Sequence, residues 1–303
     1  MKALALLHFG LGLVLAPLLP GVINRVKALF GGRKGKPLLQ LYFDLAKLLR
    51  KGAVYSSTTT WVFRAGPVAG LAALLLALAL LPFAGVDALS SFPGDVFLFA
   101  YLLGLARFCT MLAALDTGSS FEGMGAAREA LFSALAEPAL VLAFLVFISQ
   151  SGSLSLSGML KSPANLDWVL HGPSLLLIAA ALFLVLLSEN CRIPFDDPNT
   201  HLELTMIHEV MVLDHSGPDL AFILYGASLK LWIFAALLVN AVAPWGMSSD
   251  WLDGTAALLC MFLVAAAVGI MESIMARYRL PQVPKALTVA GALALLALVL
   301  TWR

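Results

Sequence analysis

The sequence has little charge, and this shortage excludes large classes of protein. Only 12% of its 303 residues are charged, whereas 61% are hydrophobic. Soluble domains carry roughly twice that share of charged residues. The formal net charge of +1 offers no broad basic surface of the kind that binds nucleic acid. The composition therefore predicts an all-α polytopic integral membrane protein that lies in a lipid bilayer and binds no nucleic acid.

Cysteine is equally scarce. Cys109, Cys191 and Cys260 are far apart and form no CxxC pair. This spacing argues against a disulfide scaffold, and against an iron–sulfur cluster or a metal site held by this chain alone. The chain also lacks a Walker A motif, a GxGxxG fingerprint and an HExxH motif. We therefore expect no cofactor to be bound by this chain.

Long apolar runs, in contrast, are abundant. Eight of them are long enough to cross the hydrocarbon core of a bilayer. They lie near Leu4–Ile23, Gly66–Gly85, Val96–Leu115, Leu131–Gln150, Gly172–Glu189, Leu220–Val242, Gly254–Ser273 and Ala286–Trp302. We interpret residues 1–303 as a single membrane domain with cytoplasmic loops near 24–65, 116–130, 190–219 and 274–285.

The basic residues predict the orientation of these spans. Nine of them lie between the first two spans, from Arg25 to Arg64. The opposite side of the membrane would hold only Lys2, Lys161 and Arg303. Cytoplasmic loops carry an excess of lysine and arginine. The pattern therefore predicts that both termini lie outside.

The first loop contains a short amphipathic segment, 36–52. Its leucines, Leu38, Leu41, Leu45, Leu48 and Leu49, share one face at helical spacing, while Asp44, Lys47 and Lys51 lie on another. One interpretation is an interfacial helix on the inner leaflet. The other is a cavity wall or a docking face for a partner protein.

Ionisable residues recur inside or at the edge of the spans. Arg107, Glu137, Glu189, Lys230 and Glu272 occupy these positions. Lone charges in a membrane cost several kcal/mol, so each marks a candidate functional site. One explanation for these residues is that they form ion pairs within the bundle, such as Glu272 with Arg277 or Arg279. Because carboxylates recur in several spans, we favour a proton path in which buried carboxylates exchange protons.

The loop at 188–219 has an unusual number of titratable residues. Asp197-Pro198 is typical of a helix start and Gly217-Pro218 is typical of the matching stop, which predicts a helix of about five turns. His201, His208 and His215 are seven residues apart and would form one stripe. Histidines about 10 Å apart along an axis do not share one metal ion. Two interpretations of this loop remain: a solvated polar face, and a surface that handles protons or docks a partner.

The stretch Glu189–Asp196, ENCRIPFD, resembles the E-x-x-R-x-P-F-D signature of the complex I subunit 1 family. That family includes the membrane-anchor subunits of formate hydrogenlyase and of related group 4 nickel–iron hydrogenases. Three further stretches are similar to the family in order and spacing. They are the first-loop segment 37–48, Gly125–Arg128 with Glu137 downstream, and Glu272-Ser273 followed by Ala276–Arg279.

The resemblance implies a non-catalytic subunit of an oxidoreductase complex in a bacterial or archaeal cytoplasmic membrane. Such a subunit connects hydrogenase-like large and small subunits, which carry iron–sulfur clusters and in the hydrogenases nickel–iron, to antiporter-like membrane subunits. It couples them to proton or sodium translocation through an acidic funnel. By this resemblance Glu137 and Glu189 are funnel carboxylates, and Arg192 and Asp196 shape the loop that faces the peripheral arm.

Together with the other ionisable residues, these positions give two predicted sets. The predicted proton path comprises Arg107, Glu129, Glu137, Glu189, Asp196, Glu203, Glu209, Lys230 and Glu272. The predicted partner-facing surface comprises Asp44, Lys47, Arg128, Arg192, Asp197, His201, His208, Asp214 and His215.

One departure from the family pattern bears on quinone. Complex I members usually end this loop with E-Y-S-G, whereas this chain has Asp214-His215-Ser216-Gly217. The change argues against quinone binding and favours the hydrogenase-related branch. Two alternatives remain: the quinone-chamber subunit of an NADH:quinone oxidoreductase, and an independent secondary transporter.

Overall fold

The computed structural model of the chain describes residues 2–161, 168–197, 206–243, 245 and 249–302. Across these residues the architecture is helical, with a single isolated β-bridge between Phe83 and Val86. The helices are α1 (Lys2–Leu15), α2 (Leu18–Phe30), α3 (Gln40–Leu49), α4 (Trp61–Leu80), α5 (Asp95–Asp116), α6 (Ser120–Ser151), α7 (Leu156–Lys161), α8 (Trp168–Glu189), α9 (His208–Met211), α10 (Gly217–Val242), α11 (Asp250–Ile274), the 3₁₀ turn η2 (Leu280–Gln282) and α12 (Val283–Thr301).

Seven spans in the described residues are each long and apolar enough to cross a membrane. They are α4, α5, α6, the 172–189 part of α8, α10, α11, and η2 with α12. The pair α1 and α2 makes an eighth if it is counted as one span with a 47° bend. The predicted fold class, an all-α polytopic membrane protein, is confirmed.

The bend in the first span has a clear cause. Pro17 has no N–H for the carbonyl of Leu13, which lies four residues earlier. The hydroxyl of Tyr225 on α10 donates to that carbonyl at 2.8 Å. The hydroxyl of Tyr42 on α3 donates to the next carbonyl, that of Val14, at 2.5 Å. The break is therefore tied to the amphipathic helix and to the centre of the bundle.

Small residues let the helices approach closely. A side chain at Gly66 on α4 would come within 3.0 Å of the Cys109 carbonyl on α5. A side chain at Gly269 on α11 would come within 3.0 Å of the Ile23 carbonyl on α2. Such close backbone approach is how helices associate in lipid, where the hydrophobic effect does not drive them together.

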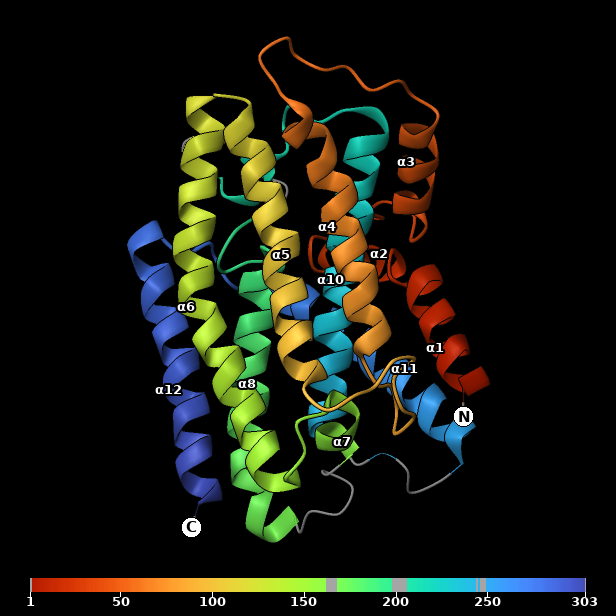
Figure 1. Cartoon of the computed structure of the whole chain (residues 1–303), viewed down its shortest axis with the longest axis vertical. Coiled ribbons are helices and arrows are strands. Elements are labelled where there is room, and N and C mark those ends of the chain that lie inside the picture. The colour runs from red at the N-terminus through yellow and green to blue at the C-terminus, as the bar shows by residue number, and fades with distance from the viewer. Residues whose placement is uncertain (1, 162–167, 198–205, 244, 246–248, 303) are drawn as a thin grey trace.

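The helix α10 lies at the centre of the bundle (Figure 1). In its most apolar stretch 67% of the residues are buried, the largest share among the seven spans. In the same view α12 lies beside α6 and α8, α1 begins in the lower half, and α12 ends at the foot. The amphipathic helix α3, which was predicted, lies at the opposite, upper end. The side that faces the cytoplasm stays a prediction.

The predicted five-turn helix after Asp197 is wrong over residues 206–216, and its first part, 198–205, lies outside the described residues. Within the described part of this loop only His208–Met211 is helical. Gly217 and Pro218 begin α10 instead of ending a helix. Proline is favoured in a first helical turn, and Gly217 has a φ of +55°, which suits glycine. A dipeptide typical of helix ends is thus a helix start here.

A second difference concerns α6. The predicted span was Leu131–Gln150, but the helix begins at Ser120. Because of this extension, Glu129 and Glu137 lie on one helix, about two turns apart.

Candidate functional site

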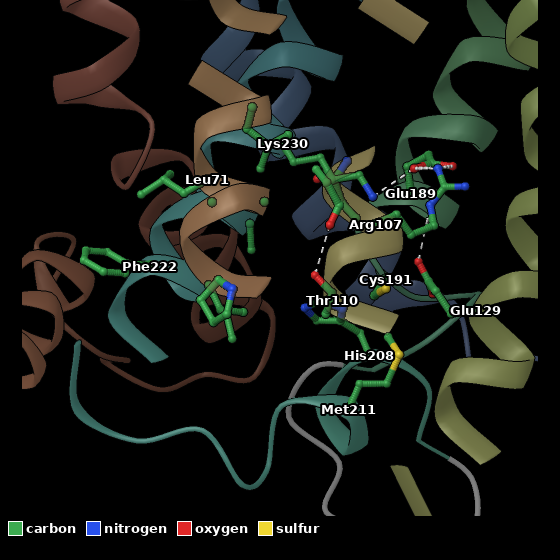
Figure 2. A pocket seen from close by; sticks show the side chains of 18 of the residues that line it. Leu71, Arg107, Thr110, Glu129, Glu189, Cys191, His208, Met211, Phe222 and Lys230 are labelled. Atoms are coloured by element: carbon green, nitrogen blue, oxygen red, sulfur yellow. Dashed lines mark hydrogen bonds and ion pairs between the residues drawn. The ribbon is translucent and has the colours of Figure 1, made fainter. Parts of the chain in front are cut away.

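Arg107 on α5 is buried among three carboxylates, Glu129, Glu137 and Glu189. Figure 2 shows Arg107 with Glu129 and Glu189. Its Nη2 donates to both carboxylate oxygens of Glu189 at 2.6 Å, and its Nη1 donates to Glu137 at 2.8 Å. Its Nε lies 3.7 Å from an oxygen of Glu129. The Nζ of Lys230 lies 2.9 Å from Glu189. We call these five residues the Arg107 cluster.

Four helices build the Arg107 cluster. Arg107 comes from α5, Glu129 and Glu137 come from α6, Glu189 ends α8, and Lys230 comes from α10. A lone charge inside a membrane bundle is unfavourable by several kcal/mol, and opposite charges in close contact offset that cost. The cluster therefore ties α5, α6, α8 and α10 together.

The three carboxylates differ in their number of cationic partners, in their exposure and in their distance from Arg107. Glu189 has two cationic partners, whereas Glu137 pairs with Arg107 alone among the described residues and its side chain is 55% exposed. Glu129 is nearly buried and sits at the longest distance, 3.7 Å. Within these five residues, two cations face three carboxylates. The cluster therefore has one more carboxylate than it has cations.

A cavity of about 100 Å³ opens beside the cluster (Figure 2). Arg107, Glu129, Glu189 and Lys230 line it, together with Thr110, Cys191, Met211 and His208. This volume has room for several water molecules. It is smaller than the roughly 300–1,000 Å³ of typical small-molecule sites. The cavity within this chain is therefore suited to water and protons.

A second ionic group, which we call the loop clamp, lies at the ends of α2, α8 and α11. Glu272, with a fully buried side chain, lies 2.7 Å from Lys27 and 3.5 Å from Arg192. Its partners are these residues rather than the expected Arg277 or Arg279. Arg277 instead lies 2.8 Å from Asp196.

Asp196 holds the loop in place. Its carboxylate accepts hydrogen bonds from the backbone N–H groups of Ile207 and His208 at 3.2 and 3.3 Å. Burial raises the pKa of Asp196, while Arg277 and the backbone hydrogen bonds oppose that rise. Asp196 pairs with Arg277 and also bonds the backbone of His208, and His208 lines the cavity beside the Arg107 cluster. The segment 207–208 therefore connects the loop clamp to that cavity.

The histidines do not form the predicted stripe. Burial, with Lys230 nearby, lowers the pKa of His208 to about 4, so His208 is neutral at pH 7. His215 lies outside the cavity lining, in the turn before α10, and its ring stacks on Phe63 with centroids 3.9 Å apart. Burial lowers the pKa of His215, and Asp219 and Asp214 oppose that shift. His201 and Glu203 lie outside the described residues.

The remaining predicted residues are spread around this end of the bundle. Asp44 and Lys47 lie on α3, and Glu209 lies on α9. Arg128 lies on α6 and donates to the Met206 carbonyl at 2.9 Å. Asp197 and Asp214 lie before and after α9, and Asp214 is exposed. Their predicted roles stay predictions.

Sequence reasoning missed Lys27 as a partner of Glu272. It was counted among the basic residues of the first loop, but α2 continues to Phe30. A signal was available, because Lys27 lies four residues after the buried Ile23 and therefore on the same helical face.

The fold and site define a polytopic membrane protein with an ionic cluster inside its helical bundle. The chain belongs to the NADH dehydrogenase subunit 1 family, because the family profile described as NADH dehydrogenase matches residues 1–302. The predicted family resemblance is confirmed.

Two relatives come from Escherichia coli (strain K12). The chain is 31% identical over 290 residues to formate hydrogenlyase subunit 4, covering 94% of this chain and 93% of that protein. It is 31% identical over 274 residues to hydrogenase-4 component C, covering 88% and 85%. An NADH-quinone oxidoreductase subunit from Rickettsia canadensis (strain McKiel) is 24% identical over 278 residues, covering 88% and 78%.

A solved structure has the same fold. One chain of the membrane-bound sulfane sulfur reductase, an archaeal respiratory membrane complex, aligns with a TM-score of 0.82 at 22% identity, covering 97% of this chain and 98% of that chain.

We predict that His215→Phe is tolerated and reduces acid sensitivity. Both ring nitrogens of His215 are buried without a hydrogen-bond partner in the described residues, and a phenyl ring can keep the stack on Phe63. A folded-state pKa below the ordinary 6.5 gives stability that is present above about pH 6.5 and lost as pH falls below it. Thermal melting at pH 8 and pH 5.5 should show a smaller acid-induced loss in the variant.

The matched control is His215→Gln, which keeps polar atoms but loses the ring. It should be less stable than His215→Phe at pH 8. Equal acid-induced losses in the wild type and His215→Phe would contradict this account of His215.

Proposed function

We propose that this chain is the membrane-anchor subunit of a group 4 hydrogenase-like or complex I-like respiratory complex. It joins hydrogenase-like large and small subunits, which carry iron–sulfur clusters and, in the hydrogenase branch, nickel–iron, to antiporter-like membrane subunits. The chain itself performs no redox step and passes protons, or sodium ions, through the Arg107 cluster. The observation that carries this proposal is the buried cluster of three carboxylates around one arginine, in a chain related over 94% of its length to formate hydrogenlyase subunit 4.

The peripheral arm docks, in this proposal, on the end of the bundle that holds α3 and α9. The partner-facing residues in this proposal are Asp44, Lys47, Arg128, Arg192, Asp197 and Asp214. Of the other predicted positions, His208 lines the cavity, His215 is buried against Phe63, and His201 lies outside the described residues. Two contacts support a mechanical link from this surface to the cavity. Asp196 bonds the backbone of His208, and Arg128 bonds the Met206 carbonyl. A shift of the loop on redox turnover would therefore move a residue that lines the cavity.

A membrane subunit covers the face between α5 and α6. Glu137 lies in the middle of α6, and its half-exposed carboxylate opens into a groove of about 630 Å³. Phe97, Ala100, Tyr101, Phe108 and Val141 form part of the wall of this groove, and Arg107 and Glu189 reach it from inside. A carboxylate that faces lipid tails costs about 3 kcal/mol. A partner helix with polar groups would remove that cost and continue the ion path.

In this mechanism Glu189 stays ionised, because Arg107 and Lys230 both hold it. The exchangeable proton resides on Glu129, the carboxylate held at the longest distance. Cavity water delivers the proton to Glu129. When Arg107 turns towards Glu129, the proton passes from Glu129 to Glu137, and Glu137 releases it into the groove when Arg107 returns, because a nearby cation favours the ionised carboxylate. Neutral His208 stays outside the transfer but shapes the cavity.

We predict that Glu129→Gln and Glu189→Gln each leave the complex assembled but reduce ion translocation by roughly tenfold or more. Each change removes one carboxylate from the three and equalises cations and carboxylates in the cluster, so the exchangeable proton is lost. The measurement is ion uptake into inverted vesicles per electron transferred, driven by the donor that the co-purified catalytic subunit uses. Glu129 is the proton carrier in this mechanism, and removal of such a group typically costs a factor of about 10²–10⁴ in catalysis, so tenfold is a lower bound.

The control is Asp250→Asn, a carboxylate in the first turn of α11 that is exposed and distant from the cluster. Asp250→Asn should leave the rate of ion uptake and the rate of electron transfer unchanged. Wild-type coupling in both glutamine variants would refute the role of the cluster. Purification of the chain alone as a stable transporting protein would instead favour a secondary transporter.

We also predict that the α5–α6 groove contacts a membrane partner. A cysteine-reactive photocrosslinker at Ala100→Cys or Val141→Cys, which line the groove, should capture a membrane subunit in native vesicles. The matched control is Leu259→Cys on α11, whose exposed side chain lies on another face. Capture from Leu259 but not from the groove would contradict the proposed docking face.

A further inference from the structure

We propose that the cavity at the end of α2 binds the phosphate group of an anionic membrane lipid. This cavity has a volume of about 340 Å³ and lies between the last turn of α2 and the loop that follows. Asn24, Lys27, Arg33 and Lys36 line it, together with Gly31 and Gly35. It is distinct from the Arg107 cluster, and the inference does not depend on the proposed function.

The charge of this segment is of one sign. Residues 24–36 contain five cations, Arg25, Lys27, Arg33, Lys34 and Lys36, and no carboxylate. Lys27 is compensated by Glu272 at 2.7 Å, which is part of the loop clamp. Arg33 and Lys36 are exposed at the mouth of the cavity. The exposed charges of Arg33 and Lys36 are therefore available to a ligand, and neither charge is buried when the site is empty.

Backbone bonds hold the loop in its curled shape. The amide of Arg33 donates to the Ala28 carbonyl at 2.8 Å, and the amide of Gly31 donates to the Lys27 carbonyl at 3.0 Å. The side chain of Arg25 donates to the Lys34 carbonyl. The two backbone bonds, to the carbonyls of Ala28 and Lys27, also satisfy carbonyls at the C-terminal end of α2, which would otherwise repel an anion.

Glycine makes the close return possible. Gly35 has a φ of +66°, and a side chain there would come within 2.5 Å of the Ala28 side chain. The loop therefore packs directly on the helix, and the cavity is formed before any ligand arrives. A preformed site loses less conformational entropy on binding than a free basic tail would lose.

Exposed apolar side chains on the last turn of α2 favour a lipid over a free phosphate. Leu29 and Phe30, the last residues of α2, are 67% and 58% exposed. They lie on faces of α2 other than the one that lines the cavity, so acyl chains can pack on them while the headgroup reaches the basic residues, whereas a soluble anion gains nothing from this apolar surface. Basic pockets next to spans bind acidic headgroups in this way.

Lipid occupancy would also act on the loop clamp. Lys27 lines the cavity and pairs with Glu272, so a phosphate near Lys27 competes with that carboxylate. The site is thus placed to link the lipid composition of the leaflet to the packing of α2 against α11.

The test uses the whole complex in lipid nanodiscs, one set of phosphatidylcholine alone and one of an equimolar mixture with phosphatidylglycerol. The measurement is the amount of phosphatidylglycerol retained after detergent extraction, determined by native mass spectrometry, with thermal melting as a second readout. Arg33→Gln with Lys36→Gln should reduce retention roughly tenfold or more, because each basic residue near an anionic surface contributes to binding. It should also abolish the stabilisation by phosphatidylglycerol.

Two further variants keep the test decisive. Arg50→Gln with Lys51→Gln removes the same charge after α3, outside the cavity, and should retain the lipid like the wild type. Arg33→Lys with Lys36→Arg keeps the charge and should also retain it, even if the glutamine pair assembles poorly. Equal loss in the Arg50 and Lys51 pair would overturn the proposal, because the attraction would then be a general surface effect.

The source of the phosphate is tested separately. Inorganic phosphate added to the phosphatidylcholine nanodiscs should neither stabilise the complex nor displace phosphatidylglycerol. Stabilisation by inorganic phosphate alone would overturn the lipid assignment in favour of a soluble anion. Crosslinking of Lys36 to an acidic segment of a partner subunit, without retained lipid, would overturn it in favour of a protein contact.

Discussion

The need to neutralise Arg107 inside a membrane bundle is the constraint on which the rest of the structure depends. A guanidinium in that position is unfavourable unless carboxylates surround it, and α6 and α8 supply them at 2.6 to 3.7 Å. Lys230 on α10 adds a second cation against Glu189. The helices that meet at this point are therefore fixed by charge as well as by packing. Because the carboxylates outnumber the cations, the same arrangement that stabilises the bundle is the basis of the proton path proposed above.

Close helix packing at glycines and hydrogen bonds to backbone carbonyls hold the bundle together around the cluster. Glycines at Gly66 and Gly269 let backbones approach closely, so packing supplies the attraction that the hydrophobic effect cannot supply between helices in lipid. The bend at Pro17 frees backbone carbonyls, and two tyrosine hydroxyls occupy them. These contacts tie the first span to α3 and α10. Movement of the amphipathic helix would thus reach the helix that carries Lys230.

Much of the architecture could be predicted because a bilayer allows few choices. Long apolar runs must be helices, and an ionisable residue inside one is conspicuous; Arg107, Glu137, Glu189 and Lys230 were identified in this way. The pairing of Glu272 with Lys27 was not, because the two residues are far apart in sequence and no local rule selects that contact over Arg277. The loop after Asp196 was predicted wrongly for a different reason. Gly-Pro occurs both after a helix and at the start of one, and the tertiary contacts of Asp196 with the backbone of Ile207 and His208 decide the outcome.

The central claim is that Arg107 and Glu189 act as one unit within the membrane. A double-mutant cycle tests it most directly, with Arg107→Gln, Glu189→Gln and the double variant compared with the wild type by denaturant unfolding in mild detergent micelles. If the two residues act as one unit, the double variant is more stable than the sum of the single losses implies, with a coupling free energy of at least about 1 kcal/mol. Losses that add to within about 0.5 kcal/mol would contradict it.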